Sequence, residues 1–199
     1  MGRSVFPSPQ IKNVIDMSIK HGNISNELAE PWLKRKFETE TIEKLKKEAS
    51  NGNGDSASKV GIIYYFGEYG IGLDREEAGK WFKIAADAGD VTGMAEHGEK
   101  LMETGGIDSA ACLHGFSLLS RAAGSSSCAS LYLGRLYAGK IKPRLSNFPI
   151  DNKCAIIFLE QAVRLSRGGC RGGCGDKLKV SEEYEKKCEE LLKKLKDEA

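Results

Sequence analysis

The residues in this sequence best suited to chemistry are three cysteines near its C-terminus. Cys170 and Cys174 are separated by three intervening residues in the glycine-rich stretch SRGGCRGGCGDK, and Cys188 follows in a predicted helix. These thiols could begin a zinc site or form a disulfide, but zinc takes four ligands, usually from two paired motifs, and no second pair is present. A metal-binding or thiol-redox protein that uses Cys170, Cys174 and Cys188 is therefore the alternative hypothesis.

Residues with catalytic potential do not form a recognisable set. His97 lies on the apolar stripe of a predicted helix, where a packed histidine is expected more often than a ligand or a base. The sequence has no Ser/His/Asp order, no HExxH motif and no Walker loop. We therefore expect a protein that is not an enzyme and that needs no cofactor.

Composition gives no argument for nucleic acid or membrane partners. The 30 Lys and Arg residues nearly balance the 28 Asp and Glu residues, and the two Arg-Gly-Gly triplets lack the interleaved aromatic residues that stack on bases. The sequence has no apolar run near the ~18 residues that span a bilayer, and its first residues lack the apolar core of a signal peptide. We expect a cytoplasmic or nuclear protein with a protein or peptide partner and with its cysteines reduced.

The remaining function to consider is binding, and helices must position the residues that would bind a partner. The stretch 56–90 predicts a helix, a turn rich in glycine and a second helix. Apolar and small residues recur at helical spacing in both halves, so each helix has one apolar stripe. Asp74, with Glu77 three residues later, predicts a capping box at the start of the second helix. Two helices this short need neighbours to bury their stripes.

The same pattern returns twice along the chain. Val60-Gly61 corresponds to His97-Gly98 and to Leu133-Gly134, and the glycines are spaced by 98−61 = 37 and 134−98 = 36 residues. In the second helices, Trp81-Phe82-x-x-Ala85-Ala86 corresponds to Leu118-Leu119-x-x-Ala122-Ala123 and to Phe158-Leu159-x-x-Ala162-Val163. The third unit has an enlarged turn between Gly139 and Ile150. A recurring period of this length indicates a helical repeat protein.

The repeated pattern resembles the Sel-1-like repeat, LGxxYxxGxGVxxDxxxAxxWFxxAAxxGD, a relative of the tetratricopeptide repeat. The first unit matches nearly throughout, whereas the second has His97, Leu101 and Gly115 in place of Leu, Tyr and Ala. The resemblance covers about residues 39–165. It implies an all-α fold, a right-handed α-solenoid of helix–turn–helix repeats, and an adaptor that holds partner proteins.

The pattern also predicts the organisation of the chain. We expect an N-terminal tail and helices over 1–38 and a repeat domain over 39–165, with units at about 56–90, 91–126 and 127–165. A Gly/Cys-rich loop over 166–180 and a capping helix over 181–199 should follow. Pro31 is expected to interrupt or open a helix near it.

The predicted interaction surface is the concave face of such a solenoid, which the first helix of each unit should build. Its candidate residues stand one position after the stripe glycine or at the next helical neighbour of that position. The predicted partner-binding residues are Ile62, Tyr65, Glu99, Met102 and Arg135.

Overall fold

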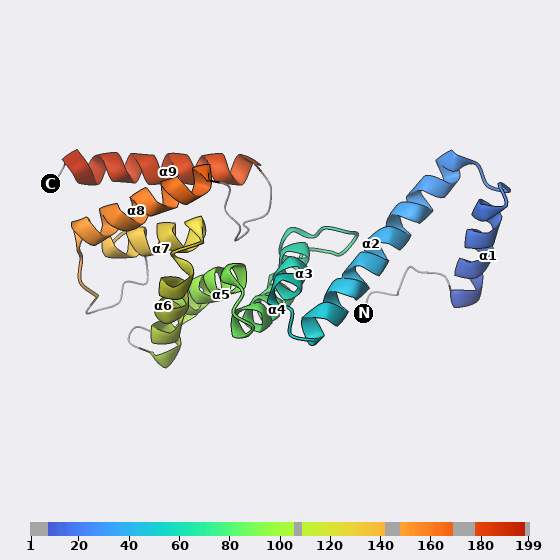
Figure 1. Ribbon diagram of the computed structural model, residues 1–199, viewed down its shortest axis with the longest axis horizontal. Helices are drawn as coiled ribbons and strands as arrows, with labels where there is room; N and C mark the ends of the chain where they lie inside the picture. The colour runs from blue at the N-terminus through green and yellow to red at the C-terminus, as the bar shows by residue number, and fades with distance from the viewer. Residues whose placement is uncertain (1–7, 106–108, 142–147, 169–177, 198–199) are drawn as a thin grey trace. The chain divides into compact units, whose positions relative to one another are not determined.

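The computed structural model describes residues 8–105, 109–141, 148–168 and 178–197. All regular structure in these residues is α-helical, as the sequence predicts (Figure 1). The helices are α1 (Pro9–Lys20), α2 (Asn26–Ser50), α3 (Gly54–Phe66), α4 (Arg75–Asp87), α5 (Val91–Thr104), α6 (Ala110–Ala122), α7 (Ser127–Tyr137), α8 (Asn152–Arg167) and α9 (Leu178–Asp197).

The chain divides into two compact units, Met1–Glu43 and Lys44–Ala199. In the first unit, the carboxylate of Asp16 on α1 accepts a hydrogen bond from the indole of Trp32 (3.0 Å) and pairs with Lys36, both on α2. The expectation that Pro31 interrupts or opens a helix was wrong, because α2 begins five residues earlier and continues through it. A proline there removes the hydrogen bond that its own N–H would have donated to Glu27 and crowds the Glu27 carbonyl, yet α2 continues to Ser50.

The second unit is a stack of helix pairs. α3 packs on α4, α5 on α6 and α7 on α8, while α4 also contacts α5, and α6 contacts α7. The first helices of the pairs touch as well, α3 with α5 and α5 with α7. Each pair therefore contacts its neighbours along the chain, which is the architecture of an all-α solenoid.

Each of the six successive helices from α3 to α8 begins with a side-chain N-cap. The residue before each helix is Asn, Asp or Ser, and its side-chain oxygen accepts a hydrogen bond from a backbone N–H of the first turn. Asp74 caps α4 as predicted, but the reciprocal half of the capping box is not made. The Glu77 carboxylate instead accepts from the Trp81 indole (3.1 Å) and from Lys80 (3.0 Å).

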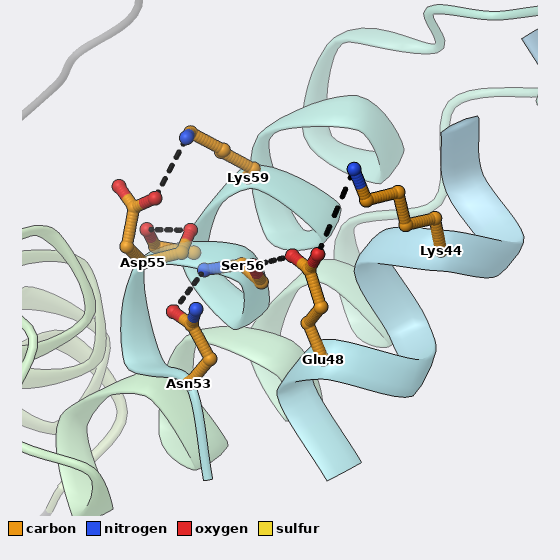
Figure 2. Close-up of polar contacts among 7 residues, drawn as sticks. Lys44, Glu48, Asn53, Asp55, Ser56 and Lys59 are labelled. Atoms are coloured by element: carbon orange, nitrogen blue, oxygen red, sulfur yellow. Dashed lines mark hydrogen bonds and ion pairs between the residues drawn. The ribbon is translucent and has the colours of Figure 1, made fainter. Parts of the chain in front are cut away.

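Polar contacts join the end of α2 to the start of α3 (Figure 2). The Asn53 side chain accepts from the Ser56 N–H at 3.0 Å, and the Ser56 hydroxyl donates to the Glu48 carboxylate at 2.7 Å. Ser56 is 2% exposed, so its hydroxyl needs this partner. The last turns of α2 are thereby tied to the first pair, and Ala49 packs with Ala57 and Ala85.

The stripe glycines mark the places where two helices of a pair approach most closely. A Cβ built on Gly61 would lie 2.7 Å from the Phe82 ring, and one on Gly134 would lie 2.7 Å from the Leu159 side chain. Both distances are too short for a real side chain. The sequence-based interpretation of these glycines as packing positions is confirmed.

The last helix closes the stack. Cys188, Leu192 and Leu195 of α9 are buried in one cluster with residues of α7 and α8, including Leu131 and Leu159. Figure 1 shows α9 lying along α8. α9 begins at Leu178, a few residues before the predicted start of the capping helix at 181.

The enlarged turn of the third unit ends in an aromatic cluster. The ring of Phe148 lies 4.8 Å from that of Tyr137 on α7 and 5.5 Å from that of Phe116 on α6. Tyr137 also stacks on Phe158 of α8 at 5.6 Å. The extra length of this turn thus supplies a ring that contacts two successive helix pairs.

Candidate binding surface

One surface is built from equivalent positions on the three first helices. The positions lie two before, one after and five after the stripe glycine, so they fall at i, i+3 and i+7 on one face of each helix. We call this surface the first-helix face; its residues are Lys59, Ile62 and Phe66 on α3, Glu96, Glu99 and Glu103 on α5, and Tyr132 and Arg135 on α7.

Glu99 lies at the centre of this face and has a raised pKa. The side chain is half-buried, and burial, together with the neighbouring carboxylates of Glu96 and Glu103, raises its pKa to about 7. Arg135 on α7 acts in the opposite direction. α5 and α7, which belong to different repeats, contact each other, so Glu99 and Arg135 lie on adjacent helices.

Tyr132 stands three residues before Arg135 on α7 and packs in the core cluster that includes Met102. It is 5% exposed, and its hydroxyl has no hydrogen-bond partner among the residues that the structure describes. Burial and then the charge of Glu99 raise its pKa above its ordinary value. A buried hydroxyl without a partner costs free energy in the folded protein.

Arg135 lies on the first-helix face and also lines a groove. Its side chain is exposed and lines an open groove of about 400 Å³ between α7 and α9, together with Leu131, Lys187, Glu190, Leu191 and Lys194. A second and larger hollow of about 670 Å³ lies between α8 and α9, where the ion pairs Arg167–Glu189 (2.6 Å) and Lys196–Glu160 (2.7 Å) cross it. That second hollow is part of the interface by which α9 is attached.

The structure separates the five predicted binding residues into two groups. Ile62, Glu99 and Arg135 occupy equivalent positions on the first-helix face. Tyr65 and Met102 stand four residues after the stripe glycine, on the side of the helix that packs against its pair.

Met102 is a core residue rather than a surface residue. It is 2% exposed, its sulfur lies 3.6 Å from the Cys112 sulfur on α6, and it would contact a Cβ at position 115. Tyr65 is 37% exposed at the end of α3, with its ring 6.5 Å from that of Phe82 and the Arg75 guanidinium 5.5 Å above it. Tyr65 is accessible, but it faces α4.

Sequence reasoning did not find Tyr132, Glu96 or Glu103. The sequence did contain the information needed to find them. A residue three positions before Glu99 or Arg135, or four positions after Glu99, lies on the same helical face. The stripe glycine also marks the side that packs on the second helix, and a step of four from it returns to that side.

The cysteines of the alternative hypothesis are not brought together in the part of the chain that the structure describes. Cys170 and Cys174 lie outside the described residues, and Cys188 is 2% exposed in the cluster beneath α9. Among the described residues, no group of three or more His, Cys, Asp or Glu is placed to hold a metal ion. His97 is half-buried on α5, and burial lowers its pKa, as expected for a packed histidine.

Comparison with known proteins supports the fold. No family model matches the chain. A curated protein of Arabidopsis thaliana, the ERAD-associated E3 ubiquitin-protein ligase component HRD3A, is 37% identical over 62 residues. That stretch is 31% of this chain and 9% of the relative, so the chain matches a small part of that protein.

Two solved structures are similar along most of the chain. One is a protective antigen of uropathogenic Escherichia coli strains with an SLR fold, at a TM-score of 0.50 and 22% identity over 76% of this chain and 37% of that one. The other is a Sel1 repeat protein from Oxalobacter formigenes, at a TM-score of 0.49 and 22% identity over 77% of this chain and 97% of that one.

A search of the described helices found none long and apolar enough to cross a membrane. The helix pairs, the recurring caps and the stripe glycines agree with the repeat pattern predicted from the sequence, and the antigen displays that repeat architecture. The chain therefore has the Sel1-like repeat fold.

Proposed function

We propose that this chain is a non-catalytic adaptor that holds a segment of another protein on the first-helix face. One observation carries the proposal: Glu99 and Arg135 occupy equivalent positions in successive repeats, on first helices that contact each other. Repeats that direct equivalent side chains to one surface create an extended face, which suits a partner longer than a small molecule.

The composition of the face agrees with such a partner. It combines apolar side chains on α3 (Ile62 and Phe66), carboxylates on α5 and a guanidinium on α7. Phe66 is 37% exposed, so an apolar side chain of a partner could cover it. The similarity of part of this chain to a component of an E3 ubiquitin-protein ligase supports an adaptor, since a component acts within an assembly.

The test compares two faces of the same fold. Ile62→Ala and Arg135→Ala alter the first-helix face, whereas Arg121→Ala removes an exposed guanidinium from the second helix α6. The partner is identified by affinity capture from native lysate with quantitative mass spectrometry, and its affinity is then measured with purified proteins by isothermal titration calorimetry.

We expect Arg135→Ala and Ile62→Ala each to weaken binding by roughly 1 kcal/mol or more, as residues at the centre of an interface do. Arg121→Ala should bind like the wild type, and circular dichroism should show all three variants folded. A partner retained equally by all three would exclude the first-helix face as the binding surface.

A further inference from the structure

We propose that the groove between α7 and α9 binds an acidic stretch of the partner protein, in which carboxylates flank one apolar side chain. We call it the α7–α9 groove. This inference rests on the proposed function, because Arg135 belongs both to the first-helix face and to this groove. It adds the chemistry of the partner segment and the end of the face at which that segment is anchored.

The α7–α9 groove is built from one face of each of two helices. Leu131 and Arg135 line it from α7 and stand four residues apart. The residues that line it from α9 stand at i, i+3, i+4 and i+7, and they are Lys187, Glu190, Leu191 and Lys194. Residues at these spacings lie on one side of a helix. Its volume of about 400 Å³ is within the range of roughly 300–1,000 Å³ that is usual for ligand clefts.

Positive charge is in excess in this groove. The lining has three cationic side chains, those of Arg135, Lys187 and Lys194, and one carboxylate, that of Glu190. Arg135 and Lys194 are exposed, and neither makes an ion pair with a residue that the structure describes. Guanidinium and ammonium groups form charge-assisted hydrogen bonds to carboxylates. An acidic segment would therefore complement the charge of the groove.

The charges on the other side of α9 are paired within the protein. In the hollow between α8 and α9, Arg167 pairs with Glu189 at 2.6 Å and Lys196 pairs with Glu160 at 2.7 Å. Those pairs join α9 to α8. Arg135 and Lys194 make no comparable pair in the described parts of the chain, so both remain available to a partner.

The apolar part of the lining favours a protein segment over a nucleic acid. Leu131 is 4% exposed in the cluster shared by α7, α8 and α9, and the half-buried Leu191 packs against that cluster. An apolar side chain of the partner can cover Leu191, whereas no aromatic ring lines the described groove for stacking on bases.

The glutamates of α5 limit where an acidic stretch can lie on the first-helix face. Glu96, Glu99 and Glu103 would repel carboxylates of the partner. The acidic stretch is therefore expected at the end of the face formed by α7, where Arg135 leads into the groove.

The experiment uses the full chain and synthetic peptide pools of known chemistry. Each pool has a fluorescein label, an amidated C-terminus and a central leucine between two runs of mixed residues. The runs contain Asp and Glu in the acidic pool and Asn and Gln in the neutral pool, and a third pool keeps the acidic runs but replaces the leucine with serine. Fluorescence anisotropy measures binding to the wild type, Lys194→Gln, Arg135→Ala and Lys193→Gln.

Lys193→Gln is the matched control. Lys193 is the exposed neighbour of Lys194 on α9, but it lines the hollow on the α8 side of the helix. Both substitutions remove one positive charge from the same helix, so they differ in which hollow loses it. Circular dichroism should show all variants folded.

We expect the acidic pool to bind the wild type about tenfold more tightly than the neutral pool, because each exposed ion pair contributes little and three act together. The preference should shrink as the ionic strength rises from about 0.05 M to about 0.5 M, since salt screens exposed charges. Lys194→Gln and Arg135→Ala should each weaken the acidic pool by about two- to fivefold, and Lys193→Gln should leave it unchanged. Serine in place of the leucine should weaken binding by about fivefold.

Three outcomes would overturn the groove. They are equal affinity for the acidic and neutral pools, equal losses in Lys193→Gln and Lys194→Gln, and equal affinity for the leucine and serine pools. An oligouridylate that binds more tightly than the acidic pool and depends on Lys194 would assign the groove to nucleic acid, and this also overturns the proposal.

Failure of the groove can be told apart from failure of the proposed function. Ile62 lies on α3 and does not line the groove. If the peptides show no acidic preference but Ile62→Ala and Arg135→Ala weaken binding of the captured partner, the groove assignment is wrong and the first-helix face stands. If the captured partner ignores both substitutions, the proposed function fails and the acidic segment fails with it.

Discussion

Gly98 and Gly115 face each other across α5 and α6 at backbone contact distance. A Cβ built on Gly115 would lie 2.8 Å from the carbonyl oxygen of Gly98, and one built on Gly98 would lie 3.0 Å from the carbonyl oxygen of Gly115. Neither neighbour is a flexible side chain, so a methyl group at either position must push the two helices apart. The closest approach within the second repeat therefore depends on both glycines.

Gly115→Ala should destabilise the protein in spite of alanine's better helix propensity. Overpacking costs typically about 1–3 kcal/mol, against roughly 1 kcal/mol gained in propensity, so the free energy of unfolding should fall by up to about 2 kcal/mol. Gly79→Ala on α4 is the matched control, because a Cβ there meets no atom within 4 Å. It should raise the free energy of unfolding by about 0.5–1 kcal/mol. Urea denaturation of both variants measures the difference, and a stabilised Gly115→Ala would contradict the contact.

Glu99→Gln should change stability in a pH-dependent way. The folded protein raises the pKa of Glu99 from an ordinary value near 4.5 to about 7, so folding favours the protonated form. The stabilising contribution of that proton is complete below about pH 4.5 and is lost as the pH rises through 7. The variant should therefore be more stable than the wild type by about 1–3 kcal/mol at pH 8 and equal to it at pH 4.5. Equal differences at both pH values, in urea denaturation, would place Glu99 in water rather than in a half-buried site.

Leu195→Ala should weaken the attachment of α9. The side chain is 2% exposed in the cluster shared with α7 and α8, and truncation of a buried leucine costs about 2–5 kcal/mol. Lys193→Ala alters an exposed neighbour on the same helix and should change stability by less than about 0.5 kcal/mol. Thermal unfolding, with binding of a hydrophobic dye as a measure of the uncovered third pair, distinguishes them. A Leu195→Ala protein as stable as Lys193→Ala would show that α9 does not cap the stack.

Trp81 combines packing with a hydrogen bond, and two substitutions separate these contributions. Its ring packs against Ala49, Ala57 and Ala85, and its indole N–H donates to Glu77. Trp81→Ala should cost about 3 kcal/mol, since the ring is only half-buried, and Trp81→Phe about 1 kcal/mol. Equal losses in chemical denaturation would assign the whole effect to the hydrogen bond. Ile84→Ala, at a side chain that is 43% exposed, should change little.

The repeat architecture could be predicted because its determinants are local. Asp74 caps its helix through neighbours two and three residues away, and Gly67 ends α3 in the left-handed conformation with φ of 70°. Such features are visible in a short window of sequence. The replacement of Ala78 by Gly115 in the second repeat looked like a departure from the pattern. In the structure it is matched by Gly98 on the facing helix, a pairing that a single sequence does not reveal.

The binding face was predicted only in part because it depends on contacts between repeats. Ile62, Glu99 and Arg135 follow from the position of the stripe glycine, whereas the burial of Met102 depends on α6 lying against it. Burial likewise raises the pKa of Glu99, and Arg135, which is 36 residues further along the chain (135−99 = 36), acts against that shift. The sequence pattern alone predicts on which side of its helix a residue lies. Whether that side is exposed depends on the packing of the neighbouring helix.

The ring of Phe148 has a consequence for how the protein unfolds. In a linear array, each repeat can in principle melt separately, and cooperativity depends on the interfaces between neighbours. The interface between α6 and α7 is smaller than that between α4 and α5, yet Phe148 contacts Phe116 on one side of it and Tyr137 on the other. We therefore expect Phe148 to couple the second and third repeats, so that these two pairs melt together.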